Sequence, residues 1–284
     1  MRRSRVFAIT IIMISFLVST GCQYDKVVKS DDFDWKYEMA KKYYNEGDYA
    51  RSLPLLNQLL AVKVGTPEEK EIRYYMAYCY YGQGDFFSAA SYFKQVFLLY
   101  PQSSEAEETL FMSAKAMYDA SPRYELDQSY TYRALDAFQY FVDVYPKSPL
   151  VAQANDLMDE MRKKLEKKMR SNADLYYNTG NYQAAAVTYK NMLLDFPDTH
   201  DAEEISFRIL SSYFNFAGQS IICRKAERYD MAIASYEDFI RQYPESKKAD
   251  QAKSFYERSI ALKQSALDEI NTYKYKCDEY TEKN

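Results

Sequence analysis

The chain has 284 residues, of which 27% are charged and 47% are hydrophobic, and it contains only seven Gly and eight Pro. This composition excludes an intrinsically disordered protein. The net charge of −4 argues against a general nucleic-acid-binding surface, so no nucleic-acid partner is expected. Thirty residues are Tyr and one is Trp, and the large ring and polar tip of Tyr suit half-exposed seams between helices.

The first 22 residues have the order of an export signal. Three Arg precede an apolar run over residues 6–18, which is shorter than a comfortable membrane span. Ser19, Thr20 and Gly21 then stand directly before Cys22, an order that resembles a lipobox, although Ser19 stands where Leu is most common. We expect a lipoprotein signal peptide over residues 1–21 and acylation of Cys22. A plain cleaved signal peptide and an uncleaved anchor are the alternatives.

Residues 22–32 follow as a short polar tether that holds the lipid. Several acyl chains on one Cys give stable membrane anchoring. Gln23 follows Cys22 where an Asp would resemble the inner-membrane retention signal, which favours the outer membrane. Removal of the signal peptide takes away three Arg and no acid, so the net charge becomes about −7. Asp31 or Asp32 is placed to cap the first helix that follows.

Residues 74–101 read as two helices joined by a tight turn. Ala77 and Tyr80 share one face of the first helix, and Ala89 and Phe93 share one face of the second. A Gly-Asp pair separates the two helices, and a Pro ends the second. Such a hairpin cannot bury its apolar side alone and must stack on copies of itself.

Four further copies of this pattern lie along the chain, and the two best copies have the same distance from the Gly of the turn to the final Pro. The pattern resembles the tetratricopeptide repeat (TPR) family, whose unit is about 34 residues. The resemblance implies an all-α solenoid of about five helical hairpins with a C-terminal capping helix. We expect repeats one to three over residues 33–147, and repeats four and five with the capping helix over 148–284.

The repeats have irregular parts. Residues 121–127 are an insertion in repeat three, and helices over 148–179 form an unusually long arm. Within this arm residues 162–170 are a basic run, which is either a solvated helix face or a contact for acidic partner residues or lipid headgroups. Repeat five is expected to have a long first helix over 202–227, and residues 249–280 read as the terminal helix.

Three cysteines follow Cys22. Cys79 lies at an interior position of a repeat helix, which is typical of a buried thiol. Cys223 and Cys277 both belong to the C-terminal block, so a disulfide between them is conceivable, but nothing in the sequence fixes their distance.

The sequence gives little support to an enzymatic function. His200 is the single histidine and lies beside Asp198 and Asp201 in an expected turn, where a surface or capping residue is more common than a catalyst. The chain has no Gly-rich phosphate loop, no Cys pair at metal spacing and no nucleophile elbow. We therefore expect neither a cofactor nor a metal ion.

The first helices of a TPR stack line a concave groove, and the repeat register places many aromatic residues there at i, i+4, i+7 spacing. A Tyr-rich groove with a few Lys suits an extended peptide that has aromatic side chains and a carboxylate. The alternative is that these rings only pack helix against helix. The candidates are Tyr37, Lys41, Tyr44, Tyr74, Tyr78, Tyr81, Phe111, Lys115 and Tyr118, followed by Tyr177 from the fourth repeat.

An export signal ending in Cys, a short tether and about five TPR hairpins together resemble the BamD family, also called YfiO or ComL. The resemblance covers the whole chain. It implies a lipid-anchored subunit of the β-barrel assembly (BAM) machinery on the periplasmic face of the outer membrane, and other BAM subunits as partners. It also implies that the C-terminal repeats bind POTRA domains of BamA, and that the N-terminal repeats bind C-terminal signal peptides of unfolded barrel proteins. Arg224, Lys225 and Arg228 are the candidates for the POTRA contact.

Two other classes of protein stay open. One is a periplasmic TPR adaptor of another envelope system, which a coiled-coil segment ahead of the repeats would favour. The other is a SusD-like glycan-binding lipoprotein, which needs a longer chain and a Trp-rich sugar site, whereas this chain has only Trp35.

Overall fold

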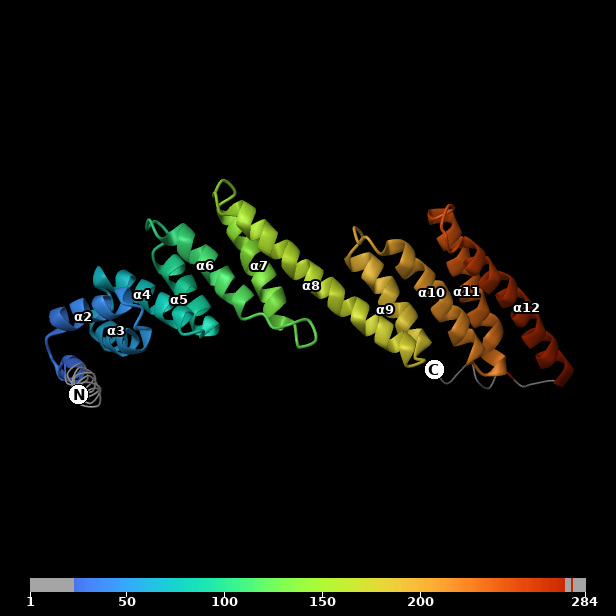
Figure 1. Ribbon diagram of the computed structural model, residues 1–284, viewed down its shortest axis with the longest axis horizontal. Helices are drawn as coiled ribbons and strands as arrows, with labels where there is room; N and C mark the ends of the chain where they lie inside the picture. Colours follow the sequence, from blue (N-terminus) through green and yellow to red (C-terminus); the bar gives the residue numbers. More distant parts are fainter. Residues whose placement is uncertain (1–22, 274–276, 278–284) are drawn as a thin grey trace, which may run out of the picture. The chain divides into compact units, whose positions relative to one another are not determined.

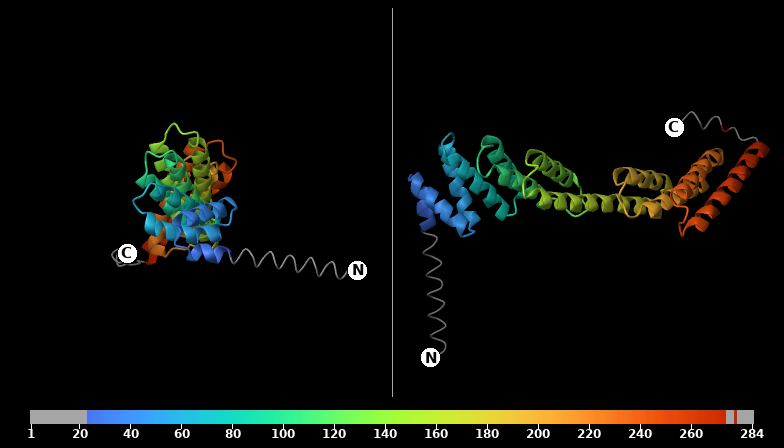
Figure 2. Two further views of the ribbon diagram at one scale, coloured as in Figure 1. Left: turned by 90° about the vertical axis from the view of Figure 1, so that its left-hand side faces the viewer. Right: turned by 90° about the horizontal axis from the view of Figure 1, so that it is seen from above.

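The computed structural model describes residues 23–273 and residue 277, and it divides into two compact units, residues 1–161 and 162–284. Throughout the described residues the regular elements are helices, which pack as successive antiparallel pairs within each unit (Figures 1 and 2). The five hairpins are α2/α3, α4/α5, α6/α7, α8/α9 and α10/α11, and α12 follows them. The expected all-α TPR solenoid with a terminal helix is therefore confirmed.

The first unit contains three complete hairpins and the beginning of α8. Its helices are α2 (Phe33–Asn45), α3 (Tyr49–Lys63), α4 (Glu68–Gly82), α5 (Phe86–Leu99), α6 (Ala106–Asp119), α7 (Ser129–Val144) and the first part of α8 (Val151–Asn178). Residues 151–178 form one helix, as expected for the long arm, and the boundary between the two units lies inside it.

The same short turn joins the helices of the first two hairpins. Gly47 and Gly84 have φ of 74° and 78°, a left-handed conformation that Gly adopts without strain. The Asp after each Gly caps the next helix: Asp48 accepts a hydrogen bond from the amide of Arg51 at 3.1 Å, and Asp85 accepts one from the amide of Ser88 at 3.1 Å. The Gly-Asp pairs in the sequence thus set where these helices stop and start.

The expected polar tether is wrong for residues 23–29. Residues 23–29 are helical, and Val27 is fully buried in the core beside α2 and α3. The Tyr24 ring lies 5.8 Å from that of Tyr43, and Lys36 Nζ donates to the carbonyl of Val28 at 3.3 Å. Val27 and Tyr24 form the apolar side of this helix, and the charged residues around them make that side hard to recognise in the sequence. Residues 1–22, with the signal peptide and Cys22, lie outside the described residues.

Asp32 is the N-cap of α2 and accepts from the amide of Trp35 at 2.9 Å, as expected. Cys79 is a fully buried free thiol, which confirms its predicted place, and burial raises the pKa of this thiol to about 11. It packs in the core with Leu55, Leu56 and Met76.

The second unit contains the rest of α8 with α9 (Tyr182–Asp195), α10 (Ala202–Gly218), α11 (Ile222–Gln242) and α12 (Ala249–Tyr273). The expected long first helix over 202–227 is wrong, because α10 ends at Gly218 and α11 starts at Ile222. Gly is a poor helix former, and the Ser220 hydroxyl donates to the carbonyl of Phe216 at 2.6 Å, which closes the turn. The long helix of this hairpin is α11.

A disulfide joins Cys223 in the first turn of α11 to Cys277 beyond α12, with their Cα atoms 5.3 Å apart. The pairing that the sequence left open is therefore present. Across residues 23–273, no helix combines the length and apolar character that a bilayer span requires.

Candidate functional site

A face of the first unit gathers tyrosines from the first helices of its hairpins, and we call it the tyrosine face. Rings from different helices touch: Tyr44 of α2 lies 4.6 Å from Tyr75 and 6.4 Å from Tyr78 of α4, between ring centroids. All of its members are half-buried, so each keeps part of its side chain exposed to solvent. The tyrosine face consists of Tyr37, Lys41, Tyr44, Tyr74, Tyr75, Tyr78, Tyr81, Lys115 and Tyr118.

Phe111 does not belong to this face, so its expected place in the groove is wrong. Its ring is 5% exposed and lies 5.7 Å from Phe138 and 5.4 Å from Phe141 of α7. A Phe has no polar tip to keep near water, and the two rings of α7 enclose it. Tyr75 is a member that the sequence reading missed, and its place beside Tyr74 in a Tyr-Tyr pair was the available signal.

Acidic side chains on neighbouring helices accept the hydroxyls of the tyrosine face. Glu108 of α6 accepts from Tyr74 at 3.3 Å and also from Tyr78. Asp119, also on α6, accepts from Tyr81 at 2.6 Å, and Glu160 of α8 accepts from Tyr118 at 2.5 Å. Burial and the hydrogen bond to Glu108 raise the pKa of Tyr78.

The lysines of the tyrosine face are paired as well. Lys41 lies 3.7 Å from Glu71, and Lys115 donates to Asp119 at 2.6 Å. Burial acts to raise the pKa of Glu71. Hydrogen bonds, one of them from Tyr75, and the nearby charge of Lys41 outweigh burial, so this pKa lies below its ordinary value. The face thus offers ring edges and carboxylates, and its two lysines are already engaged by acids of the same chain.

A polar pocket of about 250 Å³ opens beside the tyrosine face. Lys70 and Glu105 both line it and form an ion pair at 2.7 Å. The residues that line it are Pro67, Lys70, Glu71, Tyr74, Tyr75, Val96 and Glu105.

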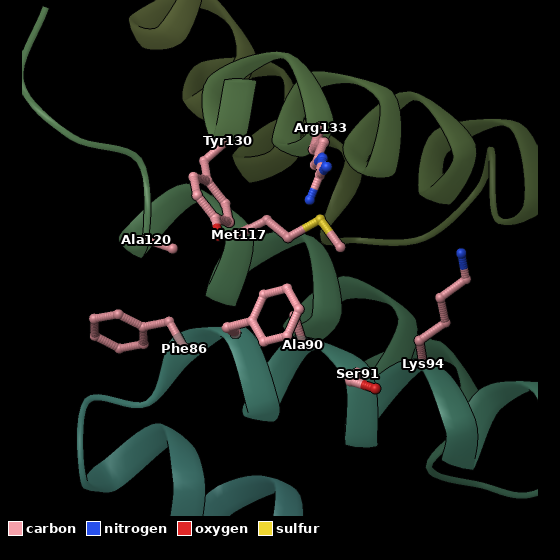
Figure 3. Close-up of a pocket in the computed structure, with 9 residues that line it drawn as sticks. Phe86, Ala90, Ser91, Lys94, Met117, Ala120, Tyr130 and Arg133 are labelled. Atoms are coloured by element: carbon pink, nitrogen blue, oxygen red, sulfur yellow. The ribbon is translucent and has the colours of Figure 1, made fainter. Parts of the chain in front are cut away.

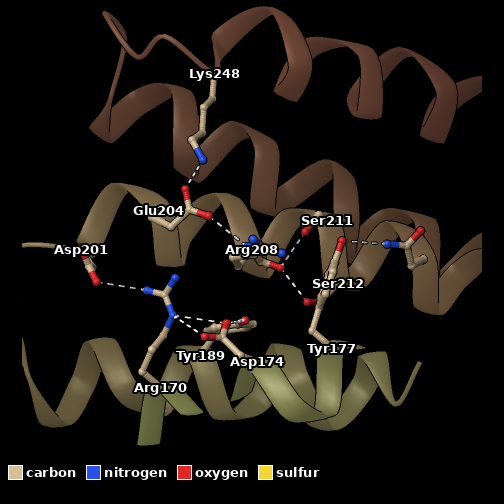
Figure 4. A network of polar contacts seen from close by, with 11 residues as sticks. Arg170, Asp174, Tyr177, Tyr189, Asp201, Glu204, Arg208, Ser211, Ser212 and Lys248 are labelled. Atoms are coloured by element: carbon tan, nitrogen blue, oxygen red, sulfur yellow. Dashed lines mark hydrogen bonds and ion pairs between the residues drawn. The ribbon is translucent and has the colours of Figure 1, made fainter. Parts of the chain in front are cut away.

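The second unit has a partly exposed polar network that the sequence reading missed (Figure 4). Arg170 of α8 contacts Asp174 at 3.1 Å and Asp201 at 3.3 Å, and Asp174 also accepts the hydroxyl of Tyr189. Arg170 is the last residue of the basic run, so at this position the run holds helices together. Its partner Asp201 is 31 residues away, which hides the pair from a local reading.

The network continues along α10. Glu204 contacts Arg208 at 3.0 Å and pairs with Lys248, which precedes α12. Burial acts to raise the pKa of Glu204, but the hydrogen bonds from Lys248 and Arg208 outweigh it, so the pKa lies below its ordinary value. The Arg208 guanidinium also stands 5.0 Å from the centroid of the Tyr177 ring. Tyr177, expected in the concave groove, is thus half-buried against this network.

The three basic candidates of repeat five lie in the first two turns of α11. Arg228 donates to the Ser220 hydroxyl at 2.7 Å and stands 4.0 Å from the centroid of the Phe216 ring, so it holds the α10–α11 turn. Arg224 contacts Glu227 at 2.9 Å, and Lys225 is half-buried in the same turn. Arg228 therefore has a structural role that its sequence position did not reveal.

His200 is exposed in the turn before α10, as expected. Among residues 23–273 and 277, no three His, Cys, Asp or Glu side chains are grouped so that they could hold a metal ion.

Comparison with known proteins gives one relative and several structures. A protein of Aquifex aeolicus (strain VF5) named for outer membrane protein assembly factor BamD is 26% identical over 152 residues, which cover 53% of this chain and 49% of the relative. The chain thus spans about half the length of the curated relative it matches. The TPR domain of P58(IPK) is 18% identical with a TM-score of 0.40, covering 85% of this chain and 68% of that one. A thermophilic TPR protein of Thermus thermophilus is 17% identical with a TM-score of 0.32, covering 81% and 99%.

Two family models match the chain. A tetratricopeptide repeat model matches residues 221–246, which contain all of α11. The model of the YfiO family, described as outer membrane lipoprotein, matches residues 31–220 and so covers most of the chain. Because this match extends from the first hairpin into the fifth, the chain belongs to the YfiO family of outer membrane lipoproteins.

Proposed function

We propose that this protein is a lipid-anchored, non-catalytic TPR scaffold of the β-barrel assembly machinery at the periplasmic face of the outer membrane. Its first unit binds segments of unfolded barrel proteins, and its second unit binds POTRA domains of BamA. Membership of the YfiO family and the name of the Aquifex relative support the general role. The tyrosine face is the single observation that supports peptide binding, because rings of α2 and α4 touch one another there and stay partly exposed.

The chemistry of the tyrosine face narrows the kind of segment it would bind. Half-buried rings give large contact areas at low entropic cost, and Tyr is enriched where binding energy concentrates. Because Lys41 and Lys115 are paired with Glu71 and Asp119, the face contacts the aromatic side chains of a segment rather than a carboxylate. The sequence reading assigned both tasks to these residues.

The complex is tested by purification from solubilised outer membranes. We expect BamA to co-purify with the tagged full-length protein, and depletion of the protein to lower the levels of outer-membrane barrel proteins while lipoproteins stay in place. Unchanged barrel-protein levels after depletion would contradict the proposed function.

The tyrosine face is tested with Tyr74→Ala combined with Tyr78→Ala. We expect at least a tenfold weaker binding of a C-terminal barrel-protein peptide, measured by fluorescence anisotropy, because two adjacent rings are lost. Tyr132→Ala is the control, since this ring is 56% exposed on α7 outside the face. Equal affinity with retained helicity by circular dichroism would assign the rings to helix packing alone.

The POTRA contact is tested by charge reversal at Arg224 and Lys225, and Arg228 is left intact because it holds the α10–α11 turn. We expect Arg224→Glu with Lys225→Glu to weaken BamA binding, whereas Lys247→Glu at an exposed position before α12 does not. If both variants bind BamA equally, the contact lies elsewhere in the protein.

The anchor is tested by Cys22→Ser, which removes the thiol that would receive the acyl chains. The variant should move from the membrane fraction to the soluble periplasmic fraction. A variant that stays in the membrane fraction would refute lipidation at this position.

A further inference from the structure

A groove runs between α5 and α7, the second helices of two neighbouring hairpins, with α6 as its floor. Two pockets of about 200 and 250 Å³ make up this α5–α7 groove, and they share Lys94, Met117 and Arg133. Met117 is two positions from Lys115 on α6, so helical geometry places the groove on the opposite side of that helix from the tyrosine face. It is therefore a separate surface of the first unit.

The repeat sequence explains why the groove is open. At the preceding junction, between α3 and α5, the rings of Tyr80 and Tyr92 stack with centroids 5.1 Å apart and fill the space. The matching repeat positions, counted from Ala77 to Ala114 and from Ala89 to Ala134, are Met117 and Ala137. Two rings are thus replaced by a thioether and a methyl group.

One end of the groove is apolar and aromatic. Figure 3 shows Phe86 of α5 on one side of the pocket and Tyr130 of α7 on the other, with Met117 and Ala120 between them. Phe87 on the rim is 63% exposed, which is unusual for a ring of this size. An occupant that covers these groups would gain from the removal of apolar surface from water.

The middle of the groove is basic. Lys94 and Arg133 come from opposite walls into the part that both pockets share (Figure 3). No carboxylate of residues 23–273 or 277 lies within ion-pair distance of either cation. The Arg133 guanidinium lies 5.6 Å from the centroid of the Tyr130 ring. The second pocket then continues past the cations over Leu110, Ala137 and Tyr140, with Asp136 as the one acid among its lining residues. The groove is thus apolar, cationic and apolar in turn.

We propose that the α5–α7 groove binds a segment of a partner protein in which an Asp or Glu side chain lies between large apolar residues. The acidic side chain lies between Lys94 and Arg133, and an apolar side chain enters each pocket. Because the groove continues beyond both cations, it suits an internal acidic residue rather than a chain terminus. This surface goes beyond the proposed function, which places peptide binding on the tyrosine face.

The experiment is selection of a phage-displayed library of random twelve-residue peptides on the full-length protein without its signal peptide. We expect enriched peptides to share an acidic residue flanked by large apolar residues. The best one is then made with acetylated and amidated ends, so that it has no terminal charges, and its affinity is measured by fluorescence anisotropy. Enrichment of peptides that lack the acidic residue, or no enrichment, would overturn the proposal.

Two variants tie this binding to the groove. Lys94→Glu with Arg133→Glu should weaken the peptide at least tenfold, because both cations are reversed, whereas Lys147→Glu, an exposed position after α7, should not. Met117→Tyr with Ala137→Tyr should recreate the ring pair of the preceding junction, close the groove and abolish binding with the thermal midpoint retained. Undiminished binding to either groove variant would overturn the proposal.

The tyrosine-face variant Tyr74→Ala with Tyr78→Ala separates this inference from the proposed function. It should bind the selected peptide as tightly as the wild type does. Loss of binding there, with retention in the groove variants, would place the peptide on the tyrosine face and refute the groove as its site.

Discussion

At the residue scale, one interaction recurs in the first unit: a Tyr hydroxyl donates a hydrogen bond to a carboxylate on the next hairpin. Glu108 and Asp119 each accept such a bond from α4, and each also belongs to a helix that buries its other side in the core. In these pairs the ring packs while the hydroxyl stays bonded, so Tyr74, Tyr78 and Tyr81 take half-buried positions without an unpaired hydroxyl.

One prediction at this scale concerns Gly82, the last residue of α4. A methyl group at this position would overlap the ring of Tyr49, which packs directly over the Gly. We expect Gly82→Ala to lower the free energy of unfolding by about 1–3 kcal/mol, measured by urea denaturation. Gly218→Ala at the end of α10 is the control, because its nearest contact is 3.9 Å away.

The cause of that loss is checked by combining Gly82→Ala with Tyr49→Ala. If the Tyr49 ring is the obstacle, the double variant loses less stability than the sum of the losses of the two single variants. Strict additivity of the two changes would show that the clash is not the cause.

A second prediction at this scale concerns acid. The pKa values of Glu71, Glu105 and Glu204 are below the ordinary value of 4.5 in the folded protein. Above pH 4.5 these groups are ionised in both states and their pairing stabilises the fold. As the pH falls below about 4.5, the unfolded chain takes up protons first, so stability declines.

Thermal unfolding between pH 7 and pH 3 measures this effect. Glu204→Gln should be less stable than the wild type at pH 7, because Lys248 and Arg208 lose their shared carboxylate. Its midpoint should also fall less between pH 5 and pH 3. A parallel fall in both proteins would show that Glu204 does not contribute to the acid sensitivity.

At the scale of elements, a Gly with positive φ lies in the turns of the hairpins α2/α3, α4/α5 and α8/α9, whereas an insertion joins α6 to α7. The insertion after α6 is held by Gln128, a 4% exposed residue that donates to the carbonyls of Arg123 and Leu126, each at 2.9 Å. Its side-chain oxygen Oε1 accepts a hydrogen bond from the Thr131 hydroxyl at 2.7 Å. The insertion is thus fixed to the start of α7, whose Tyr130 lines the α5–α7 groove.

The disulfide gives the prediction at this scale. Cys223 and Cys277 close a loop with a sequence separation of 54 residues, for which loop entropy gives a stabilisation of about 4 kcal/mol. We expect Cys223→Ser to lower the thermal midpoint of the second unit. Cys79→Ser is the comparison, because that thiol is free and buried. Equal midpoints with and without reductant would show that the cross-link does not stabilise the unit.

At the scale of the whole molecule, each of the two units has buried residues of its own, and α8 runs from one unit into the other. Leu55 and Phe138 are buried in the first unit, and Tyr189 and Phe239 in the second. Repeat proteins unfold as sums of local terms with nearest-neighbour coupling. We therefore expect two transitions in urea, followed by circular dichroism.

Each transition should respond to changes in its own unit. Leu55→Ala leaves a cavity that should lower the free energy of unfolding by about 2–5 kcal/mol and shift the transition of the first unit. Reductant opens the disulfide and should shift the transition of the second unit. Leu194→Ala, at a 76% exposed position, is the control and should shift neither. A single transition that moves with both changes would show that the units unfold together.

Local patterns in the sequence determined the hairpins, their Gly-Asp turns, the buried thiol of Cys79 and the family resemblance. These features depend on residues within one or two helical turns, where spacing alone fixes a face or a cap. The helix over 23–29 was missed because charged residues between Tyr24 and Val27 obscure its apolar side. The end of α10 at Gly218 was missed because no Pro follows to mark it.

Only the tertiary structure decided which rings are sealed and which pairs form. Phe111 and Tyr74 hold matching repeat positions, yet two rings of α7 enclose Phe111 while Tyr74 stays half-exposed beside Glu108. The hydrogen bond from Tyr118 to Glu160 joins residues 42 apart, and the disulfide joins residues 54 apart. Partners so distant in the chain meet only when hairpins stack, and no periodicity within a single helix contains that information.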